Sequence, residues 1–239
     1  SFEQYANAQP GDPLYENAMR AWSLTDLRSH VQDGSLPQVS WIVPSPVWSE
    51  HPAQSSPLQG ASFVQQVLDI LVSNPELWSK TVFLVTFDEN DGFFDHVPPP
   101  APPAYDLDDK LAGATTLPGL LGGEYYTDNV FGRVATRPYG MGPRVPLFAI
   151  SPWSRGGWVC SQVFDHTSTI RFLEARFGVM EPNISAWRRA VSGDLTRCFN
   201  FADPNLQLPV LPDMSEARAE TLVLEGNAPS VPVPQALPV

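Results

Sequence analysis

The sequence predicts an α/β fold with a parallel sheet flanked by helices, and three consecutive segments support this prediction. Residues 39–43, Val-Ser-Trp-Ile-Val, are a short apolar run that Pro44 closes, as expected of a strand. Residues 61–71 repeat apolar side chains at the spacing of an amphipathic helix. Residues 81–85 are rich in β-branched and aromatic side chains, which suits a strand buried in a parallel sheet. Strand, helix and strand together predict a βαβ unit.

Before this unit, the sequence predicts an irregular lead-in and two helices. Residues 1–15 contain a Pro-Gly-Asp-Pro turn, and a helix is expected around residues 16–22. A cap at Ser23 to Asp26 predicts a second helix that reaches about Gln32, where Asp-Gly stops it.

After the unit, residues 98–142 show little sign of regular structure, and a loop of this length is usually functional or disordered. Residues 144–150 return to strand character, and residues 158–160 form another candidate strand. A helix follows over residues 169–174, with Asp165, Thr167 or Ser168 as its cap and Gly178 at its end. Residues 187–195 suggest one more short helix.

Length and composition limit the possible functions. A chain of 239 residues fits one large domain, here residues 1–205, followed by a Pro-rich tail at residues 206–239. The net charge of −12 argues against nucleic acids and anionic membrane surfaces as partners. No segment approaches the roughly 20 apolar residues of a transmembrane helix. The first residues lack the features of a signal peptide, which leaves the compartment open.

The two cysteines, Cys160 and Cys198, lack the spacing of a zinc site. A disulfide requires their Cα atoms to lie close together, which spacing alone does not show. Two separate buried thiols explain them equally well.

Acidic residues concentrate directly after the predicted strand at residues 81–85. Asp88, Glu89, Asp91 and Asp95 follow it, with His96 beside the last of them. Carboxylates gathered at one strand end repel one another unless a cation neutralises them, and hard oxygen ligands with an imidazole suit a divalent metal. The alternative is a solvated acidic loop whose Asn-Asp-Gly forms an ordinary turn.

Three of the four histidines fall in loops beside a carboxylate: His51 follows Glu50, His96 ends the acidic segment, and His166 follows Asp165. A carboxylate neighbour orients an imidazole and raises its basicity. Each histidine alone is more often structural than catalytic, so the hypothesis depends on their shared position after strand-like runs. Nucleophile-elbow, P-loop and dinucleotide-binding motifs are absent from the sequence.

The segment from Thr86 to Pro100, Thr-Phe-Asp-Glu-Asn-Asp-Gly-Phe-Phe-Asp-His-Val-Pro-Pro-Pro, resembles the hallmark segment of the bacterial phosphoesterase family. This family contains phosphocholine-preferring phospholipases C and related acid phosphatases. Further similar segments are residues 36–43, 49–52, 142–146, 150–157 and 164–168. The resemblance runs from residue 1 to about residue 205 and is closest to the phospholipase C branch.

The resemblance implies an alkaline-phosphatase-like sheet, incomplete here because the chain matches a C-terminal portion of the catalytic domain. The implied site residues are, in chain order, Glu50, His51, Asp88, Glu89, His96, Asp165 and His166. The adjacent acids Asp88 and Glu89 would bind a divalent metal ion. The three histidines would contact the phosphate or move protons, with the acid before His51 and the acid before His166 as orienting partners.

The implied activity is metal-assisted, phospholipase C-type hydrolysis of phosphocholine esters or phospholipids through a phosphoryl-enzyme. The family's nucleophile lies in an N-terminal portion that has no counterpart here, so the isolated chain is expected to be inactive without it. By the same resemblance the protein would be bacterial and secreted or periplasmic. The alternatives are an acid phosphatase, a non-catalytic module that binds metal or phosphate, and a structural calcium site at residues 88–95.

Overall fold

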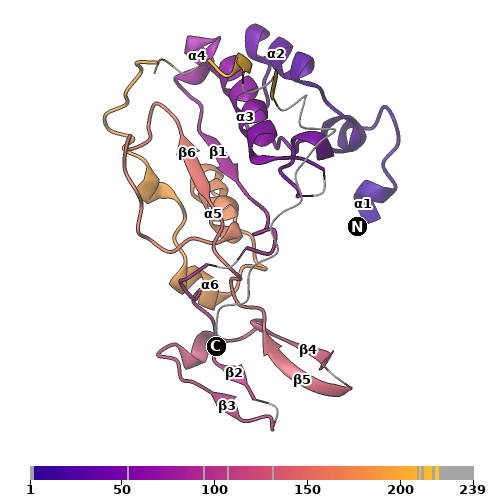
Figure 1. The fold of residues 1–239 in the computed structure, drawn as a ribbon, viewed down its shortest axis with the longest axis vertical. Helices are drawn as coiled ribbons and strands as arrows, with labels where there is room; N and C mark the ends of the chain where they lie inside the picture. The colour runs from indigo at the N-terminus through magenta and orange to yellow at the C-terminus, as the bar shows by residue number, and fades with distance from the viewer. Residues whose placement is uncertain are drawn as a thin grey trace. The chain divides into compact units, whose positions relative to one another are not determined.

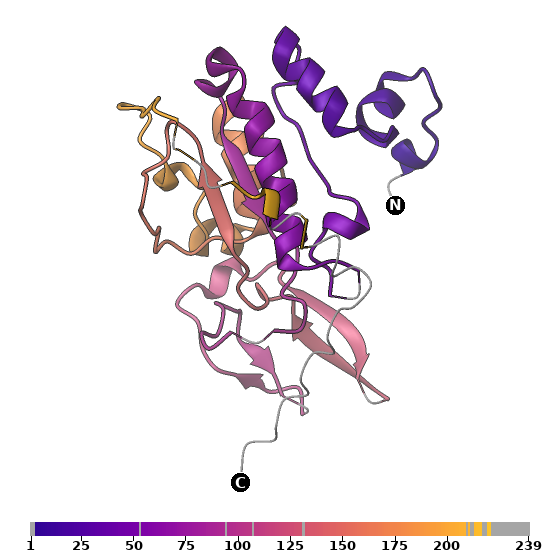
Figure 2. The same cartoon turned by 45° about the horizontal axis from the view of Figure 1, so that its top comes forward.

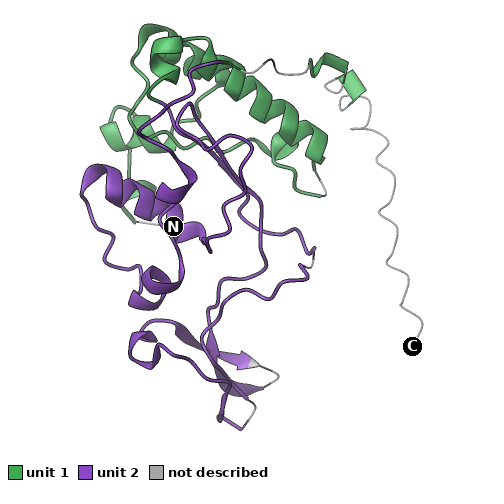
Figure 3. Cartoon of the chain, turned by 90° about the vertical axis from the view of Figure 1, so that its left-hand side faces the viewer, with its two compact units in different colours: residues 1–80, 208–239 green, residues 81–207 purple. Residues whose placement is uncertain are grey.

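The computed structural model describes residues 3–52, 54–93, 95–106, 108–130, 132–208, 210, 213–216 and 219–220. Figures 1 and 2 show its helices and strands in two views. The chain divides into two compact units, residues 1–80 with 208–239 and residues 81–207, which are coloured separately in Figure 3 and described separately below. Most of the predicted Pro-rich tail, residues 206–239, lies outside the described residues.

In the described residues of the first unit, the elements of regular structure are all helical, and irregular segments connect them. Its elements are α1 (Glu3–Ala6), the π-helical turn η1 (Tyr15–Met19), α2 (Leu24–Asp33), the 3₁₀ turn η2 (Pro46–Trp48), α3 (Pro57–Val72) and α4 (Pro75–Trp78). No helix in the described part of the chain is long and apolar enough to cross a membrane.

Helix α2 confirms the prediction made from its capping residues. The hydroxyl of Ser23 accepts from the backbone N–H of Asp26 at 3.2 Å, and the Asp26 carboxylate accepts from the Ser23 N–H at 2.8 Å. This reciprocal pair is a capping box, and it satisfies two backbone groups that a helix start leaves free. The helix ends at Gly34, whose φ of 73° is the left-handed conformation that glycine adopts without strain.

Helix α3 is longer than predicted and begins at Pro57, because Ser56 and Gln59 form a second capping box there. Its apolar face buries Val67, Ile70 and Leu71. The side chain of Asn74 donates to the Val31 carbonyl at 2.7 Å, which ties the end of α3 to α2.

The strand predicted at residues 39–43 is wrong: the segment is irregular in the structure. Trp41 is 67% exposed and Val43 is 85% exposed. A strand needs a neighbour that accepts its ladder hydrogen bonds, and this segment has none among the described residues. The predicted βαβ unit is therefore absent from the described structure.

The second unit combines three small sheets with two helices. Its strands are β1 (Phe83–Thr86), β2 (Ala104–Tyr105), β3 (Leu111–Ala112), β4 (Tyr125–Val130), β5 (Arg133–Pro138) and β6 (Leu147–Ile150). Its helical elements are η3 (Pro118–Leu120), α5 (His166–Phe177), α6 (Ala186–Val191) and η4 (Thr196–Cys198).

Strand β1 pairs with β6, and the pairing is antiparallel, with Phe83 opposite Ile150 and Thr86 opposite Leu147. The Ser151 hydroxyl extends this connection by donating to the Thr81 carbonyl at 2.6 Å. The α/β composition is confirmed, but the parallel sheet is not confirmed, because each sheet in the described residues has two antiparallel strands.

Residues 98–142 contain more structure than the sequence suggested. Strands β4 and β5 form a hairpin with six residue pairs, and Gly132 adopts a φ of 80° in its turn. The β2–β3 hairpin lies against β5, as Figures 1 and 2 show. The candidate strand at residues 158–160, in contrast, is irregular.

Helix α5 begins at His166, earlier than predicted, because Asp165 is the N-cap among the three candidates, and it ends as predicted at Gly178, whose φ is 71°. Its apolar side packs toward η4, with the rings of Phe172 and Phe199 5.2 Å apart. The last predicted helix is present as the shorter α6, which buries Trp187.

The two cysteines of the second unit are free thiols and are half-buried. Burial, together with the neighbouring Cys160 thiol, raises the pKa of Cys198 to about 11. The thiol form of Cys198 therefore predominates at neutral pH.

Candidate functional site

The seven predicted site residues occupy three places in the structure. They are Glu50 and His51 before α3, Asp88, Glu89 and His96 after β1, and Asp165 and His166 at the start of α5. The first pair belongs to the first unit and the other five belong to the second. Within the second unit, the structure joins the start of α5 to the segment after β1.

Glu50 has a strained backbone and a close helix contact. Its φ of 66° is unusual for a residue other than glycine. Its side chain covers Gly60 in the first turns of α3, where a Cβ atom would lie 2.0 Å from Oε1 of Glu50. The positive end of the helix dipole favours a carboxylate at this position. Sequence reasoning missed Gly60, although an isolated glycine in a helical pattern is a recognisable signal of a packing requirement.

His51 follows this strained residue and is exposed. Its backbone N–H donates to the Ser49 hydroxyl at 3.2 Å, which fixes the direction of the chain after Glu50. Its exposed side chain is accessible to a ligand.

The segment after β1 presents two adjacent carboxylates to solvent. Asp88 and Glu89 are both exposed, and Oδ1 of Asp88 accepts from the Glu89 backbone N–H at 3.0 Å. The chain then reverses in a turn in which Phe93 N–H donates to the Asn90 carbonyl at 2.8 Å. The Asn-Asp-Gly turn expected under the alternative of a solvated acidic loop is present, with positive φ values at Asp91 and at the glycine after it.

The donor chemistry of Asp88 and Glu89 fits part of a divalent metal site. Hard cations such as Mg²⁺ and Ca²⁺ take about six or more oxygen ligands, and this pair supplies carboxylate oxygens from exposed side chains. No group of three or more His, Cys, Asp or Glu side chains is gathered for a metal within the described ranges. A metal site at these two carboxylates would therefore need further donors.

Asp95 is fixed by an arginine that sequence reasoning did not single out. Both of its carboxylate oxygens accept from Arg144, one of them from Nη2 at 2.9 Å. The Arg144 guanidinium holds the pKa of Asp95 well below its usual range. His96 lies beside this pair, with Nδ1 3.2 Å from Oδ1 of Asp95 and a side chain that is 88% exposed.

His166 connects α5 to the acidic segment. Its Nε2 atom lies 3.0 Å from the backbone carbonyl oxygen of Phe87, the residue before Asp88. Since a carbonyl oxygen only accepts, this contact requires Nε2 to carry a proton. In the neutral imidazole, Nδ1 is then the nitrogen that can accept a proton, and the ring is exposed.

Asp165 acts on the helix start rather than on the imidazole ring. Its carboxylate accepts from the Thr167 hydroxyl at 2.6 Å and from Nη1 of Arg188 at 2.8 Å. Its backbone N–H donates to the Ser168 hydroxyl at 3.0 Å. These contacts fix the residue that immediately precedes His166.

Arg188 extends this network to two other segments of the second unit. Its Nη2 donates to the Gly140 carbonyl at 2.7 Å, and its Nε lies 3.4 Å from Oε1 of Glu124. Glu124 is 1% exposed, and its Oε2 has no hydrogen-bond partner among the described residues. Two buried carboxylates thus share one guanidinium. Sequence reasoning missed both Arg188 and Glu124, because no local pattern connects them to Asp165.

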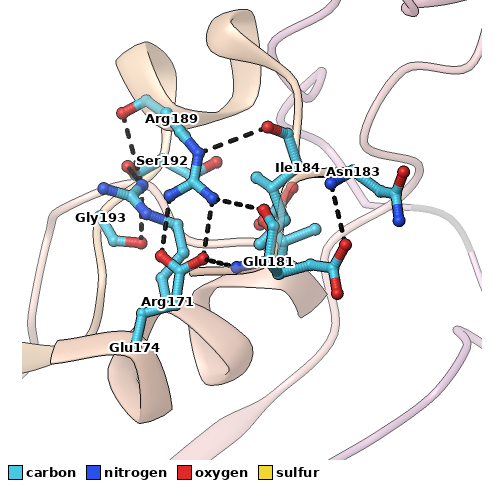
Figure 4. Close-up of polar contacts among 10 residues, drawn as sticks. Arg171, Glu174, Glu181, Asn183, Ile184, Arg189, Ser192 and Gly193 are labelled. Atoms are coloured by element: carbon cyan, nitrogen blue, oxygen red, sulfur yellow. Dashed lines mark hydrogen bonds and ion pairs between the residues drawn. The ribbon is translucent and has the colours of Figure 1, made fainter. Parts of the chain in front are cut away.

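A second ion pair holds α5 to α6 further along both helices (Figure 4). Arg189 donates to both carboxylate oxygens of Glu174, each at 2.8 Å, and to the Glu181 carbonyl at 2.7 Å. The Glu181 N–H also donates to Glu174, at 2.6 Å. Arg189 and this N–H lower the pKa of Glu174 to about 2. None of the predicted site residues takes part in this cluster.

Comparison with known proteins identifies a family match and several relatives. The model of the Phosphoesterase family matches residues 1–180. A non-hemolytic phospholipase C of Pseudomonas aeruginosa is 59% identical over 219 residues, which cover 91% of this chain and 31% of the relative. A non-hemolytic phospholipase C of Burkholderia pseudomallei is 48% identical over 225 residues, covering 90% of this chain and 31% of the relative.

A third relative, phospholipase C A of Mycobacterium tuberculosis, is 42% identical over 230 residues, covering 89% of this chain and 42% of the relative. The chain thus spans 31% to 42% of the length of these curated relatives. The similarity to these relatives covers about 90% of the chain, and it agrees with the family resemblance of the motifs around the candidate site.

Proposed function

This chain belongs to the phosphoesterase family, and on that premise we propose that it supplies part of the active site of a phospholipase C-type phosphodiesterase. The relatives named phospholipase C, at 42% to 59% identity, support this activity. The proposed substrates are phospholipids and phosphocholine esters. The reaction would release the phosphorylated head group from the glycerol oxygen.

The contact between His166 and the Phe87 carbonyl is the observation that carries the proposal. It brings an imidazole to the residue that immediately precedes Asp88 and Glu89. An imidazole and two exposed carboxylates therefore lie at one end of β1, and we assign them the roles of proton-transfer group and metal ligands. Metal-assisted hydrolysis of phosphate esters uses this combination of groups.

In the proposed reaction, a deprotonated hydroxyl (alkoxide) oxygen of the enzyme forms a bond to phosphorus, and the bond between phosphorus and the glycerol oxygen breaks. His166, protonated on Nδ1, gives its proton to the departing oxygen. The neutral imidazole then takes a proton from a water molecule, whose oxygen forms a bond to phosphorus. The bond between phosphorus and the enzyme oxygen breaks, which restores the alkoxide and releases the phosphorylated head group. A divalent metal held by Asp88 and Glu89 would offset the negative charge of the phosphoryl oxygens.

We propose that a segment of the same protein, outside this chain, supplies the remaining parts of the site. That segment would supply the nucleophile and the other metal ligands, and it would add strands that complete an alkaline-phosphatase-like parallel sheet. The exposed apolar run at residues 39–43 supports such an addition, because a new neighbour would cover Trp41 and Val43. Export to the periplasm or the medium is proposed from the family resemblance.

Glu50, His51 and His96 are proposed to contact the phosphate or to orient such contacts. The fixed geometry of Glu50 over Gly60 and the exposure of both imidazoles support this assignment. Asp165 is proposed as the residue that holds His166 in place.

The function is tested with the full-length protein, by measuring hydrolysis of a chromogenic phosphocholine ester with and without a chelator. Chelation should abolish turnover, and added divalent metal should restore it. Asp88→Ala and Glu89→Ala should each lower kcat by about 10²-fold or more, because each removes a metal ligand.

Asp128→Ala is the matched control, since Asp128 is also exposed and also accepts from the N–H of the next residue. It should keep wild-type turnover. If Asp88→Ala lowered thermal stability and left turnover unchanged, the acidic segment would be a structural cation site and the proposal would fail.

A further inference from the structure

We propose that Arg188 is a positioning residue for His166 and acts through Asp165. This inference rests on the proposed function, in which His166 transfers protons. It adds a residue that neither the sequence motifs nor the family resemblance pointed to.

Arg188 uses all three of its guanidinium nitrogens inside the second unit. They reach Asp165, the Gly140 carbonyl and Glu124 at 2.8, 2.7 and 3.4 Å. The side chain of Arg188 is 19% exposed, and those of Asp165 and Glu124 are 4% and 2% exposed. Since solvent screens this cluster little, the position of Asp165 depends strongly on the guanidinium.

Asp165 connects Arg188 to the His166 imidazole through the start of α5. Asp165 is the N-cap of α5, and His166 is the first residue of the helix. The Asp165 carboxylate and backbone N–H bind Arg188, Thr167 and Ser168, and Ser168 is fully buried. The backbone from which the His166 ring projects is thereby fixed. A shift of this cap would lengthen the contact between Nε2 and the Phe87 carbonyl.

The shape of the arginine side chain is important for these contacts. A guanidinium is a planar fork that holds several acceptors in set directions, whereas an ammonium group is a point charge on a flexible stem. The acceptors of Arg188 come from three separate segments of the chain. Lysine could keep the charge beside Asp165 but could not hold all three contacts, so Arg188→Lys should restore only part of the function.

Arg189 provides a matched control one residue away. It lies on the same helix and forms a bidentate ion pair with Glu174, but it has no contact with Asp165 or His166 in the described structure. Loss of Arg189 removes a comparable ion pair between α5 and α6 without disturbing the cap.

The experiment measures kcat, KM and thermal stability in the full-length protein, per folded molecule, with the chromogenic phosphocholine ester. The variants are Arg188→Met, Arg188→Lys, Arg189→Met, His166→Ala and the double variant Arg188→Met with His166→Ala. We expect Arg188→Met to lower kcat by about 10- to 100-fold with KM nearly unchanged. Arg188→Lys should recover part of this loss, and Arg189→Met should stay within about threefold of wild type.

The double variant separates a positioning role from a general structural role. If Arg188 acts through His166, Arg188→Met should change kcat by less than about threefold when His166 is already alanine. An equal loss in both backgrounds would overturn the inference, as would equal losses in Arg188→Met and Arg189→Met. If Arg188→Met kept the wild-type kcat while His166→Ala lowered it, the inference would fail, but the proposed role of His166 would not. Wild-type kcat in His166→Ala would overturn the proposed role of His166 and the inference together.

Discussion

Helix α5 is held to α6 by two adjacent arginines, and the two contacts differ in what surrounds them. Arg188 binds the N-cap Asp165, beside an imidazole that reaches the acidic segment, and it shares its charge with Glu124. Arg189 binds Glu174 further along α5, where the neighbouring backbone groups complete the cluster (Figure 4). Residues of the same type, side by side in the sequence, therefore serve different purposes according to the groups that they fix.

The two clusters also differ in how completely their carboxylates are hydrogen-bonded. The Glu174 carboxylate accepts from Arg189 and from the Glu181 N–H. In the other cluster, Oε2 of Glu124 is buried without a partner among the described residues. An incompletely satisfied buried polar group lowers stability. We interpret the Arg189 cluster as one that stabilises the fold and the Arg188 cluster as one that orients the site.

The largest expected difference comes from neutralising the acid at each contact. Asp165→Asn should lower kcat by about 10- to 100-fold, because the cap that fixes His166 loses its charged bond to Arg188. Glu174→Gln should leave kcat within about threefold of wild type and lower Tm by a few degrees. Both variants are measured in the full-length protein by ester hydrolysis and thermal denaturation. Similar kcat losses in the two variants would remove the functional distinction between the clusters.

A smaller difference should appear in the pH dependence of stability. Arg189 and the Glu181 N–H lower the pKa of Glu174 from 4.5 to about 2. A carboxyl group with a lowered folded-state pKa adds stability above its unfolded pKa, and this stability is lost as pH falls toward the folded value. The contribution of Glu174 should therefore be complete above about pH 5 and should disappear between about pH 4.5 and pH 2.

Urea unfolding of the wild type and Glu174→Gln at pH 5 and pH 3 checks this expectation. The difference in the free energy of unfolding between the two proteins should shrink at pH 3. A difference that stays constant would mean that the ionised carboxylate does not stabilise the folded state.

The smallest expected effect is a change in Tm. It concerns Glu50, a third carboxylate beside a helix, whose side chain covers Gly60. An alanine in place of a glycine inside a helix normally adds up to about 1 kcal/mol of stability. Here the new Cβ would lie 2.0 Å from Oε1 of Glu50, so the side chain must move. Gly60→Ala should raise Tm more in a Glu50→Ala background than in the wild type. An equal shift in both backgrounds would show that Glu50 does not occupy this position in solution.

The helices could be predicted from sequence because their signals are local. Ser23 and Asp165 cap α2 and α5 within three residues of their partners, and Gly34 and Gly178 end the same helices. Strands depend on partners that are distant in sequence. Residues 39–43 have a strand-like composition but no neighbour in the described structure, and the β4–β5 hairpin was missed because its strands lack a strict apolar alternation.

The only parts of the candidate site that could be predicted are those whose residues are neighbours in the sequence. The acidic segment, its turn and the capped start of α5 follow from neighbouring residues. The contact of His166 with Phe87 joins residues 79 positions apart, and that of Arg188 with Asp165 joins residues 23 positions apart. No local rule specifies such contacts, because they depend on how α5, α6 and β1 pack together.

The most direct test of the central claim is the turnover number of His166→Ala in the full-length protein on the chromogenic phosphocholine ester. If the start of α5 provides proton transfer beside the acidic segment, kcat should fall by about 10²- to 10⁴-fold while Tm changes little. A folded His166→Ala variant with wild-type kcat would contradict the account, because the start of α5 would then be purely structural.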